Sequence, residues 1–291
     1  MDEIAVALMA YGTPDKLEDL HDYLKGIMHG KEPSAELVKK TGEKYEKIGF
    51  SPLKDMTLKQ AILLEEELYK EGVKAKVKVG MKHWNPTINE ALNQIDLKSV
   101  SKVIGIVAHP FYSIAGSEEY KVIFKNYCKD KGIFIDSWYE NEDLYKAWKE
   151  KADQKIKEFN GEEFYTIFSS HGLPQQINDE RYKKELLDFT DKLASILNIK
   201  EYSLAYQNGD HSDWYKPDVK DEINRMKKNI LLIPIGYISE SLETLYDIDI
   251  EYAGLAYKLG INFKRVSCIG DSDLTIKAMA SAIIDRINLN K

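Results

Sequence analysis

Apolar residues gather along this chain in short runs that alternate with longer stretches of mixed character. The runs are rich in β-branched and aromatic residues, and Ile230–Ile235 is apolar almost throughout. Strands of this kind are typical of a parallel sheet that helices cover on both faces. The pattern predicts eight strands, at Ile4–Met9, Ala75–Val79, Val103–Val107, Ile133–Trp138, Phe164–Phe168, Tyr202–Ala205, Ile230–Ile235 and Phe263–Val266.

The stretches between these strands repeat their apolar residues at helical spacing. One stripe includes Phe189 and Leu193, and a second stripe near the carboxyl terminus includes Ile276, Met279 and Ile283. Apolar positions at this period mark the face of a helix that packs on a core. We therefore interpret both stripes as core-facing helices.

A weak internal repeat relates the first four strands to the second four. The first strand is followed by Tyr11-Gly12-Thr13-Pro14 and the fifth by His171-Gly172-Leu173-Pro174, so both read aromatic-Gly-x-Pro. We therefore predict an α/β fold of two similar Rossmann-like halves, each a four-stranded parallel sheet flanked by helices, with a cleft between them. The predicted bounds are 1–131 and 132–271, with a terminal helix at 272–291 packing back on the first half.

Ligands of open parallel sheets bind beyond the carboxyl ends of the strands. The residues that follow the predicted strands are rich in aromatic, histidine and hydroxyl side chains, which suits a flat, largely apolar ligand with a few polar anchors. No GxGxxG or GxxxxGK[ST] element follows a strand. Dinucleotide and nucleoside triphosphate binding therefore lose their main support.

Charge and cysteine content narrow the class of protein further. The net charge is -7 and no long block of one sign occurs, which argues against a nucleic-acid partner. The two cysteines, Cys128 and Cys268, lie far apart without a CxxC pair, so we expect neither disulfides nor a cysteine-rich metal site. An acidic amino terminus and the lack of an apolar run of about 20 residues predict a cytoplasmic protein without stable membrane insertion.

Three carboxylates form the clearest chemical pattern. Glu243, Asp247 and Glu251 stand at i, i+4 and i+8, so a helix places them in one ladder whose like charges repel unless a cation or proton is shared. A solvated acidic face is the alternative interpretation. The ladder begins just after a strand end and beside Leu242 and Leu245, which favours a partly desolvated Glu243.

His171 is the second element, since it ends a predicted strand. A lone histidine is more often structural, but one that shares a cleft with a desolvated carboxylate becomes a tuned proton acceptor or a metal ligand. For His83 and His109 we favour structural or surface roles, and we assign none to His21 and His29. No GxSxG elbow or base-paired cysteine supports nucleophilic hydrolysis.

The chain resembles the ferrochelatases, which insert Fe²⁺ into a porphyrin at the end of heme synthesis, over nearly its whole length. The residues that carry the resemblance are Tyr11-Gly12-Thr13-Pro14, Ser51-Pro52-Leu53, Met81-Lys82-His83-Trp84-Asn85-Pro86, Ser169-Ser170-His171-Gly172-Leu173-Pro174, Gln207 with Trp214-Tyr215-Lys216-Pro217, and Ser241-Leu242-Glu243-Thr244-Leu245-Tyr246-Asp247. The family's fold of two Rossmann-like halves agrees with the repeat.

By position, the resemblance implies that His171 accepts pyrrole protons with Glu243 as its partner, and that Asp247 and Glu251 extend the line that leads metal in or protons out. These four residues are the predicted metal-contacting set. Iron is then a substrate, no cofactor is permanently bound, and the porphyrin is protoporphyrin IX or coproporphyrin III. The predicted porphyrin-contacting residues are Tyr11, Thr13, Ser51, Lys82, His83, Ser113, Gln207 and Trp214.

Several positions depart from the family pattern. Glu240-Ser241 replaces the usual Asp-His, which removes one potential polar partner of the site, and 27–31 replaces the paired arginines of the bacterial branch, so propionate recognition must differ. Tyr11 matches the bacterial, monomeric branch that uses coproporphyrin, and we expect a monomer. A carboxyl terminus without cysteines excludes a [2Fe–2S] cluster.

Two other functions remain open at the level of sequence. A cobalt or sirohydrochlorin chelatase shares the two-half architecture, although such chains usually carry more histidines at the metal site. A non-catalytic tetrapyrrole carrier shares the two-lobed outline, but a carrier does not need an unpaired base beside a carboxylate ladder.

Overall fold

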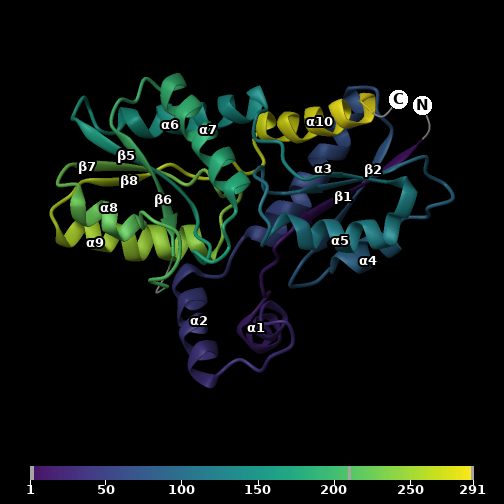
Figure 1. The fold of residues 1–291 in the computed structure, drawn as a ribbon, viewed down its shortest axis with the longest axis horizontal. Helices are drawn as coiled ribbons and strands as arrows, with labels where there is room; N and C mark the ends of the chain where they lie inside the picture. The colour runs from purple at the N-terminus through teal and green to yellow at the C-terminus, as the bar shows by residue number, and fades with distance from the viewer. Residues whose placement is uncertain (1–2, 209–210, 290–291) are drawn as a thin grey trace.

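The computed structural model describes residues 3–208 and 211–289, and this part of the chain forms two four-stranded sheets with every strand parallel (Figure 1). The first sheet has the order β2-β1-β3-β4 and the second β6-β5-β7-β8. The predicted α/β class with two parallel sheets is confirmed. The strands are β1 (Ile4–Ala10), β2 (Ala75–Met81), β3 (Val103–Val107), β4 (Gly132–Ile135), β5 (Phe164–His171), β6 (Tyr202–Gln207), β7 (Asn229–Ile233) and β8 (Phe263–Arg265).

All eight predicted strands are present, and three of them end earlier than the sequence pattern indicated: β8 by one residue, and β4 and β7 by more. β4 stops at Ile135 because Trp138 leaves the sheet and donates its backbone N–H to Pro110 O and its indole N–H to Val107 O. β7 stops at Ile233 because Pro234 has no N–H to continue the ladder. Apolar character alone does not mark these ends.

β4 lies in the first sheet, since Val103 of β3 pairs with Gly132. The predicted bounds of 1–131 and 132–271 placed this strand in the second half. The division between the two sheets therefore falls after β4, in the segment that leads into α6 (Glu142–Lys157).

Helices cover both faces of each sheet. On β1, Ile4, Val6 and Leu8 face one buried cluster, while Ala5 and Met9 face another. This alternation, with both sets buried, explains why the strand reads as apolar throughout. The remaining α- and π-helices are α1 (Leu20–Ile27), α2 (Ala35–Ile48), α3 (Leu53–Lys70), α4 (Ile88–Asn93), α5 (Ser117–Cys128), α7 (Glu180–Ile196), α8 (Val219–Arg225), a π-helix (Glu243–Tyr252), α9 (Ala253–Lys258) and α10 (Asp273–Asn288). Short 3-10 helices lie at Leu17–Asp19 and Lys129–Lys131.

One buried cluster is shared by both sheets. It joins α3 and α10, on one face of the first sheet, to α6 and α7, on one face of the second, and α10 contacts both α3 and α6. Ile276 and Met279 of α10 and Phe189 of α7 are buried in this cluster, so the two predicted stripes are confirmed as core faces. The two sheets are thus held by a continuous apolar core.

The hairpin of α1 and α2 projects away from the two sheets (Figure 1). Its small core contains Leu20, Tyr23, Leu24 and Tyr45, and Leu242, just before the π-helix, packs against it. The hairpin belongs to the first half by sequence and reaches the π-helix of the second.

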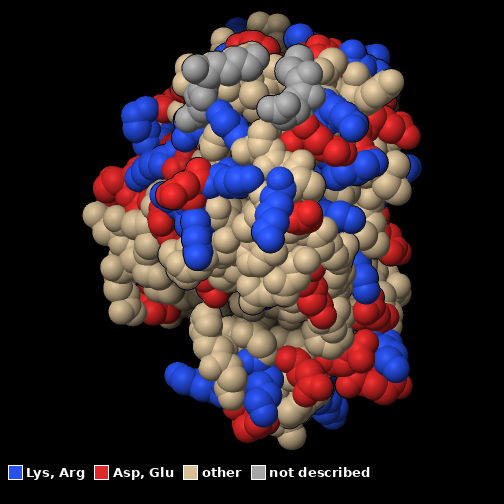
Figure 2. Space-filling model, turned by 90° about the vertical axis from the view of Figure 1, so that its right-hand side faces the viewer, with Lys and Arg blue, Asp and Glu red and all other residues tan. Residues whose placement is uncertain are grey.

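Lysine and arginine side chains are interspersed with aspartate and glutamate on the face drawn in Figure 2, which is the pattern of a solvated surface. Among the described residues, no helix is both long enough and apolar enough to cross a bilayer.

The shared core predicts a strong effect of truncating α10. Ile283 is fully buried, and Leu289 just beyond the helix is 78% exposed. We expect Ile283→Ala to lower the free energy of unfolding by about 2–5 kcal/mol, because it leaves a cavity, whereas Leu289→Ala changes it by less than about 0.5 kcal/mol. Urea unfolding measures both, and equal effects would contradict this account of the core.

Candidate active site

Several side chains of the candidate site lie where the strands end. β5 is buried over six residues and then ends at the exposed His171. β1 leads into Tyr11, and β2 leads into Lys82 and His83. Because all strands of a parallel sheet point the same way, their carboxyl ends gather these residues at one edge of each sheet.

The two glycines of the internal repeat shape these strand ends in different ways. Gly12 has a φ of +100°, which residues with a Cβ rarely adopt. At Gly172 the backbone is ordinary, but a Cβ would collide with Asn208 Oδ1. Gly12 therefore lets the chain turn tightly behind Tyr11, whereas Gly172 lets Asn208 approach the backbone behind His171.

His171 is held by its backbone and by an aromatic neighbour. Tyr182 Oη donates to the His171 carbonyl at 2.9 Å, and Trp214 packs edge-on against the imidazole with ring centroids 5.5 Å apart. His211 stacks on the indole of Trp214 at 4.3 Å. Burial lowers the pKa of His171, and the charge of His211 lowers it further, whereas the charge of Glu243 raises it. The residue is nevertheless open to solvent at the end of the strand. The imidazole is therefore neutral near pH 7 and able to accept a proton.

Glu243 begins the π-helix and is partly buried. Ser241 Oγ donates to Glu243 Oε2 at 2.7 Å. Burial raises the pKa values of Tyr11 and Tyr45, and the charge of Glu243 adds to the effect. The charge of Glu243 thus affects the pKa of Tyr11 in the first half and the pKa of His171 in the second. Functional groups of the two halves therefore lie near one another.

The three carboxylates of the ladder are carried by a π-helix, in which each N–H bonds the carbonyl five residues earlier. Lys44 of α2 contacts two of them, Asp247 at 3.0 Å and Glu251 at 3.9 Å. Lys220 lies 3.7 Å from Glu251. Burial raises the pKa of Asp247 to about 6 against the opposing effect of Lys44, and Glu243 and Glu251 add to the rise. The negative charge of Asp247 and Glu251 is thus balanced by lysines of the protein itself.

The residues of the first half that flank the site are paired with one another. The rings of Tyr11 and His83 lie 4.6 Å apart. Lys82 Nζ lies 2.6 Å from Glu119, and its side chain is only 6% exposed. Burial, with help from Lys82, lowers the pKa of His83 to about 4. Lys82 therefore already has a protein carboxylate as its partner.

Three of the predicted porphyrin-contacting side chains, Thr13, Ser113 and Gln207, are buried. Thr13 Oγ1 bonds Tyr45 Oη at 3.2 Å, and Gln207 Nε2 donates to Ser169 Oγ at 3.0 Å. These contacts point into the protein, so the structure gives these residues a supporting place behind the surface. Four other predicted contacts are partly exposed or exposed, namely Tyr11, Ser51, His83 and Trp214. The side chain of Lys82 is buried against Glu119.

A sequence profile of the ferrochelatase family matches residues 3–287. The chain belongs to the ferrochelatase family. Members of this family are lyases that insert iron into a porphyrin in heme biosynthesis, and this chain is an enzyme of that kind. The resemblance found in the sequence is confirmed, and the carrier alternative is set aside.

Relatives and solved structures agree with this family. The chain is 29% identical over 306 residues to the coproporphyrin III ferrochelatase of Geobacillus sp. strain WCH70, with 99% of both chains covered. It is 31% identical over 325 residues to the ferrochelatase of Gloeothece citriformis strain PCC 7424, covering 100% of this chain and 84% of that one. A sirohydrochlorin chelatase of Bacillus subtilis subspecies spizizenii, solved with cobalt, matches with a TM-score of 0.62 at 12% identity, covering 99% and 96% of the two chains, which shows a shared fold.

In this ferrochelatase, Ser241 stands where the family usually has a histidine, and its effect on the site differs from the one expected. The sequence suggested that losing the usual Asp-His removes a polar partner, but Ser241 itself donates to Glu243. Glu240 has a separate role, since it accepts hydrogen bonds from Arg265 and from Thr244 Oγ1. This part of the prediction was wrong because a serine at this position reaches Glu243.

Sequence reasoning missed His211 and Lys44. The only sequence signal for His211 is its position three residues before Trp214. Lys44 lies 203 positions from Asp247 in the sequence, so no local pattern connects them. Among the described residues, no three His, Cys, Asp or Glu side chains are grouped closely enough to hold a metal ion. Cys128 and Cys268 are buried and not disulfide-bonded.

The raised pKa of Asp247 predicts how stability changes with pH. The folded chain holds the proton of this carboxyl up to about pH 6, whereas the ordinary pKa is 3.8. Ionisation of Asp247 therefore costs stability as the pH rises from about 4 to about 6. We expect the stability of Asp247→Asn relative to the original chain to increase by about 1–3 kcal/mol between pH 4 and pH 7. Urea unfolding at a series of pH values measures this, and a difference independent of pH would contradict it.

Proposed function

We propose that this ferrochelatase inserts Fe²⁺ into coproporphyrin III between the carboxyl ends of its two sheets, with His171 as proton acceptor and Glu243 as its partner. The observation that carries the proposal is an imidazole at the tip of a buried strand, packed edge-on against Trp214 and within electrostatic reach of the partly buried Glu243. A base that is neutral at working pH and partly open to solvent is what removal of a pyrrole proton requires.

The proton balance fits these two groups. A free-base porphyrin carries two N–H protons, and one Fe²⁺ replaces both, so two protons leave for each metal inserted. His171 accepts the first, and the negative charge of Glu243 stabilises the imidazolium that forms. Glu243 and the ladder below it then offer carboxylates to receive protons from the site.

Asp247 and Glu251 complete the proposed metal-contacting set with His171 and Glu243. Their pairing with Lys44 supports a passage whose negative charge is already balanced, so a divalent ion does not bind there tightly at rest. Weak binding at Asp247 and Glu251 suits a substrate ion, because Fe²⁺ must leave these carboxylates readily in order to enter the porphyrin.

The flat substrate fits the aromatic character of the site. Tyr11 is 41% exposed, and Trp214 presents its ring beside His171. Both are suited to pack on a macrocycle, with His83 behind Tyr11. Distortion of the porphyrin so that a pyrrole nitrogen points toward His171 would be driven by binding energy from the rest of the ring.

Coproporphyrin III is our choice of porphyrin for two reasons. Tyr11, which the resemblance associates with the coproporphyrin-using branch, stands exposed at the end of β1. A relative named coproporphyrin III ferrochelatase also matches at 29% identity over 306 residues. The cationic partner of the propionates is not an arginine pair here, and Lys82 is already paired with Glu119.

Replacing His171 tests the catalytic role. We expect His171→Ala to lower kcat for anaerobic Fe²⁺ insertion by about a hundredfold or more, because the proton acceptor is lost, while porphyrin still binds. Absorbance follows insertion, and fluorescence quenching follows binding. Coproporphyrin III and protoporphyrin IX are offered separately, and His21→Ala on the exposed surface is the control.

A His171→Ala enzyme with unchanged turnover would refute the role of this residue. Faster insertion into protoporphyrin IX than into coproporphyrin III by the unaltered enzyme would refute the choice of porphyrin alone. The two parts of the proposal are therefore tested by separate comparisons in the same assay.

Ser241 gives a second test through its hydrogen bond to Glu243. Ser241→Ala removes this donor, and we expect kcat to fall about tenfold as the carboxylate loses its fixed orientation, whereas Ser241→Thr keeps a hydroxyl and most of the activity. Steady-state insertion assays compare the two variants. Equal kcat for Ser241→Ala and the unaltered enzyme would show that this hydrogen bond does not matter for turnover.

A further inference from the structure

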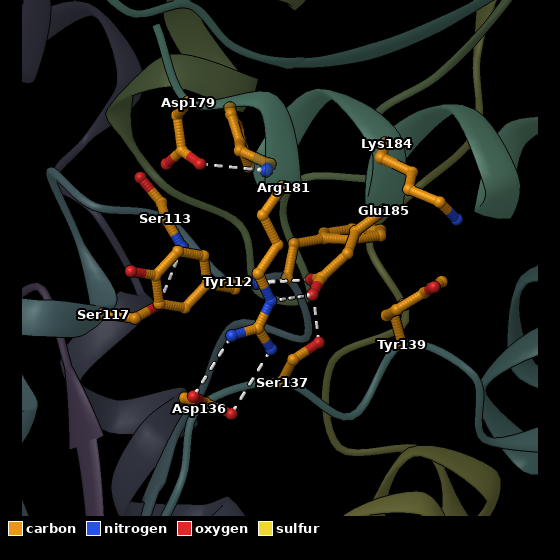
Figure 3. A network of polar contacts seen from close by, with 12 residues as sticks. Tyr112, Ser113, Ser117, Asp136, Ser137, Tyr139, Asp179, Arg181, Lys184 and Glu185 are labelled. Atoms are coloured by element: carbon orange, nitrogen blue, oxygen red, sulfur yellow. Dashed lines mark hydrogen bonds and ion pairs between the residues drawn. The ribbon is translucent and has the colours of Figure 1, made fainter. Parts of the chain in front are cut away.

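The loop that follows β3, residues 108–116, docks on the start of α7, a helix of the second half (Figure 3). The backbone N–H of Tyr112 donates to Glu185 Oε2 at 2.7 Å, and that of Ile114 donates to Asp179 Oδ2 at 2.6 Å. Between them, the N–H of Ser113 donates to Ser117 Oγ. Two of three consecutive amides of the loop are thus bound by carboxylates from the opposite half.

Both carboxylates are buried and bonded on their other oxygens as well. Asp179 is 1% exposed, and its Oδ1 accepts the N–H of Tyr182, which caps α7. Glu185 also accepts from Arg181 Nε at 2.7 Å and from Ser137 Oγ at 2.8 Å. A buried carboxylate is costly unless donors surround it, so this many partners allows each one very few orientations.

The same helix end also holds His171. Tyr182 Oη donates to the carbonyl of His171 at 2.9 Å and bonds Ser170 Oγ at 2.7 Å. The loop on the other side carries His109, whose Nδ1 bonds the carbonyl of Phe111. His109 lies close enough to His171 for their charges to interact. The start of α7 is therefore hydrogen-bonded both to the strand end that carries His171 and to the loop that carries His109.

Apolar packing alone does not determine where this loop sits. Phe111 is fully buried and packs against Phe189 of α7 with ring centroids 5.3 Å apart. Such packing is strong but non-directional, so it holds the loop on α7 without fixing its register. Hydrogen bonds from two alternate amides to two fixed carboxylates do fix the register.

We propose that Asp179 and Glu185 are positioning residues that set the spacing between residues 109–116 and His171, and thereby the fit of the porphyrin between them. The inference rests on the proposed function, because it assigns these strand ends to the porphyrin site. Neither carboxylate contacts the reacting atoms, and both act through the loop.

Asp179→Asn separates positioning from folding. One side-chain oxygen remains, and it can still accept the N–H of Tyr182, so the helix cap is kept. The amide NH₂ then faces the N–H of Ile114, and that bond to the loop is lost. The matched control is Asp218→Asn, since Asp218 is also buried and caps α8, on the other face of the second sheet, by accepting the N–H of Lys220.

Two readouts follow for Asp179→Asn. Hydrogen exchange at the Ile114 amide accelerates, and the KM for porphyrin rises about tenfold, equal to ~1.4 kcal/mol, while kcat and the KM for metal change less than about twofold. Asp218→Asn leaves all of these values unchanged. Glu185→Gln is the second variant, with Glu222→Gln as its control, because Glu222 is likewise buried and paired with an arginine of its own helix at 2.6 Å.

A raised porphyrin KM in both α7 variants and in neither control supports the proposal, and unchanged porphyrin KM in both α7 variants overturns it. Equilibrium porphyrin binding by fluorescence quenching gives the same comparison without turnover. An unaltered enzyme that inserts no metal would therefore refute the proposed function, while the binding and exchange measurements would still decide this inference.

Discussion

The site depends on one constraint, the burial of β5 up to its last residue. Because the strand is covered on both faces, its backbone is fixed, and His171 leaves the core at a single defined point. Desolvation of the imidazole itself lowers its pKa and favours the neutral form. Fold and chemistry are therefore linked, since the packing that places the base also determines its protonation state.

The rest of the site is brought to His171 by elements that are far apart in sequence. Helix α7 bonds both the carbonyl of His171 and the loop after β3, and the hairpin of α1 and α2 reaches the π-helix through Lys44 and Leu242. These contacts add to the apolar core, which is shared by both sheets and already joins the two halves. Glu243 lies within electrostatic reach of both Tyr11, which follows β1, and His171, which ends β5.

Periodicity in the sequence was enough to predict the eight strands and to place Glu243, Asp247 and Glu251 on one helical segment. It failed where a contact ends a strand, as when Trp138 turns away to bond Pro110 and Val107. It also failed for Lys44, whose partner Asp247 lies 203 positions away, and for Ser241, whose hydroxyl reaches Glu243 only in the folded geometry. The spacing of apolar residues indicates which positions are buried. It does not indicate contacts such as these, which depend on where separate helices and strands meet in the fold.

The most direct measurement is the titration of the six histidines by NMR, with His171 assigned through its substitution, in the free enzyme and after porphyrin is added. The account predicts a His171 pKa below the usual 6.5 in the free enzyme, because burial disfavours its charged form, and a change in its resonances when porphyrin binds. A His171 that titrates near 6.5 and does not respond to porphyrin would contradict the claim that this imidazole is the proton acceptor of the site.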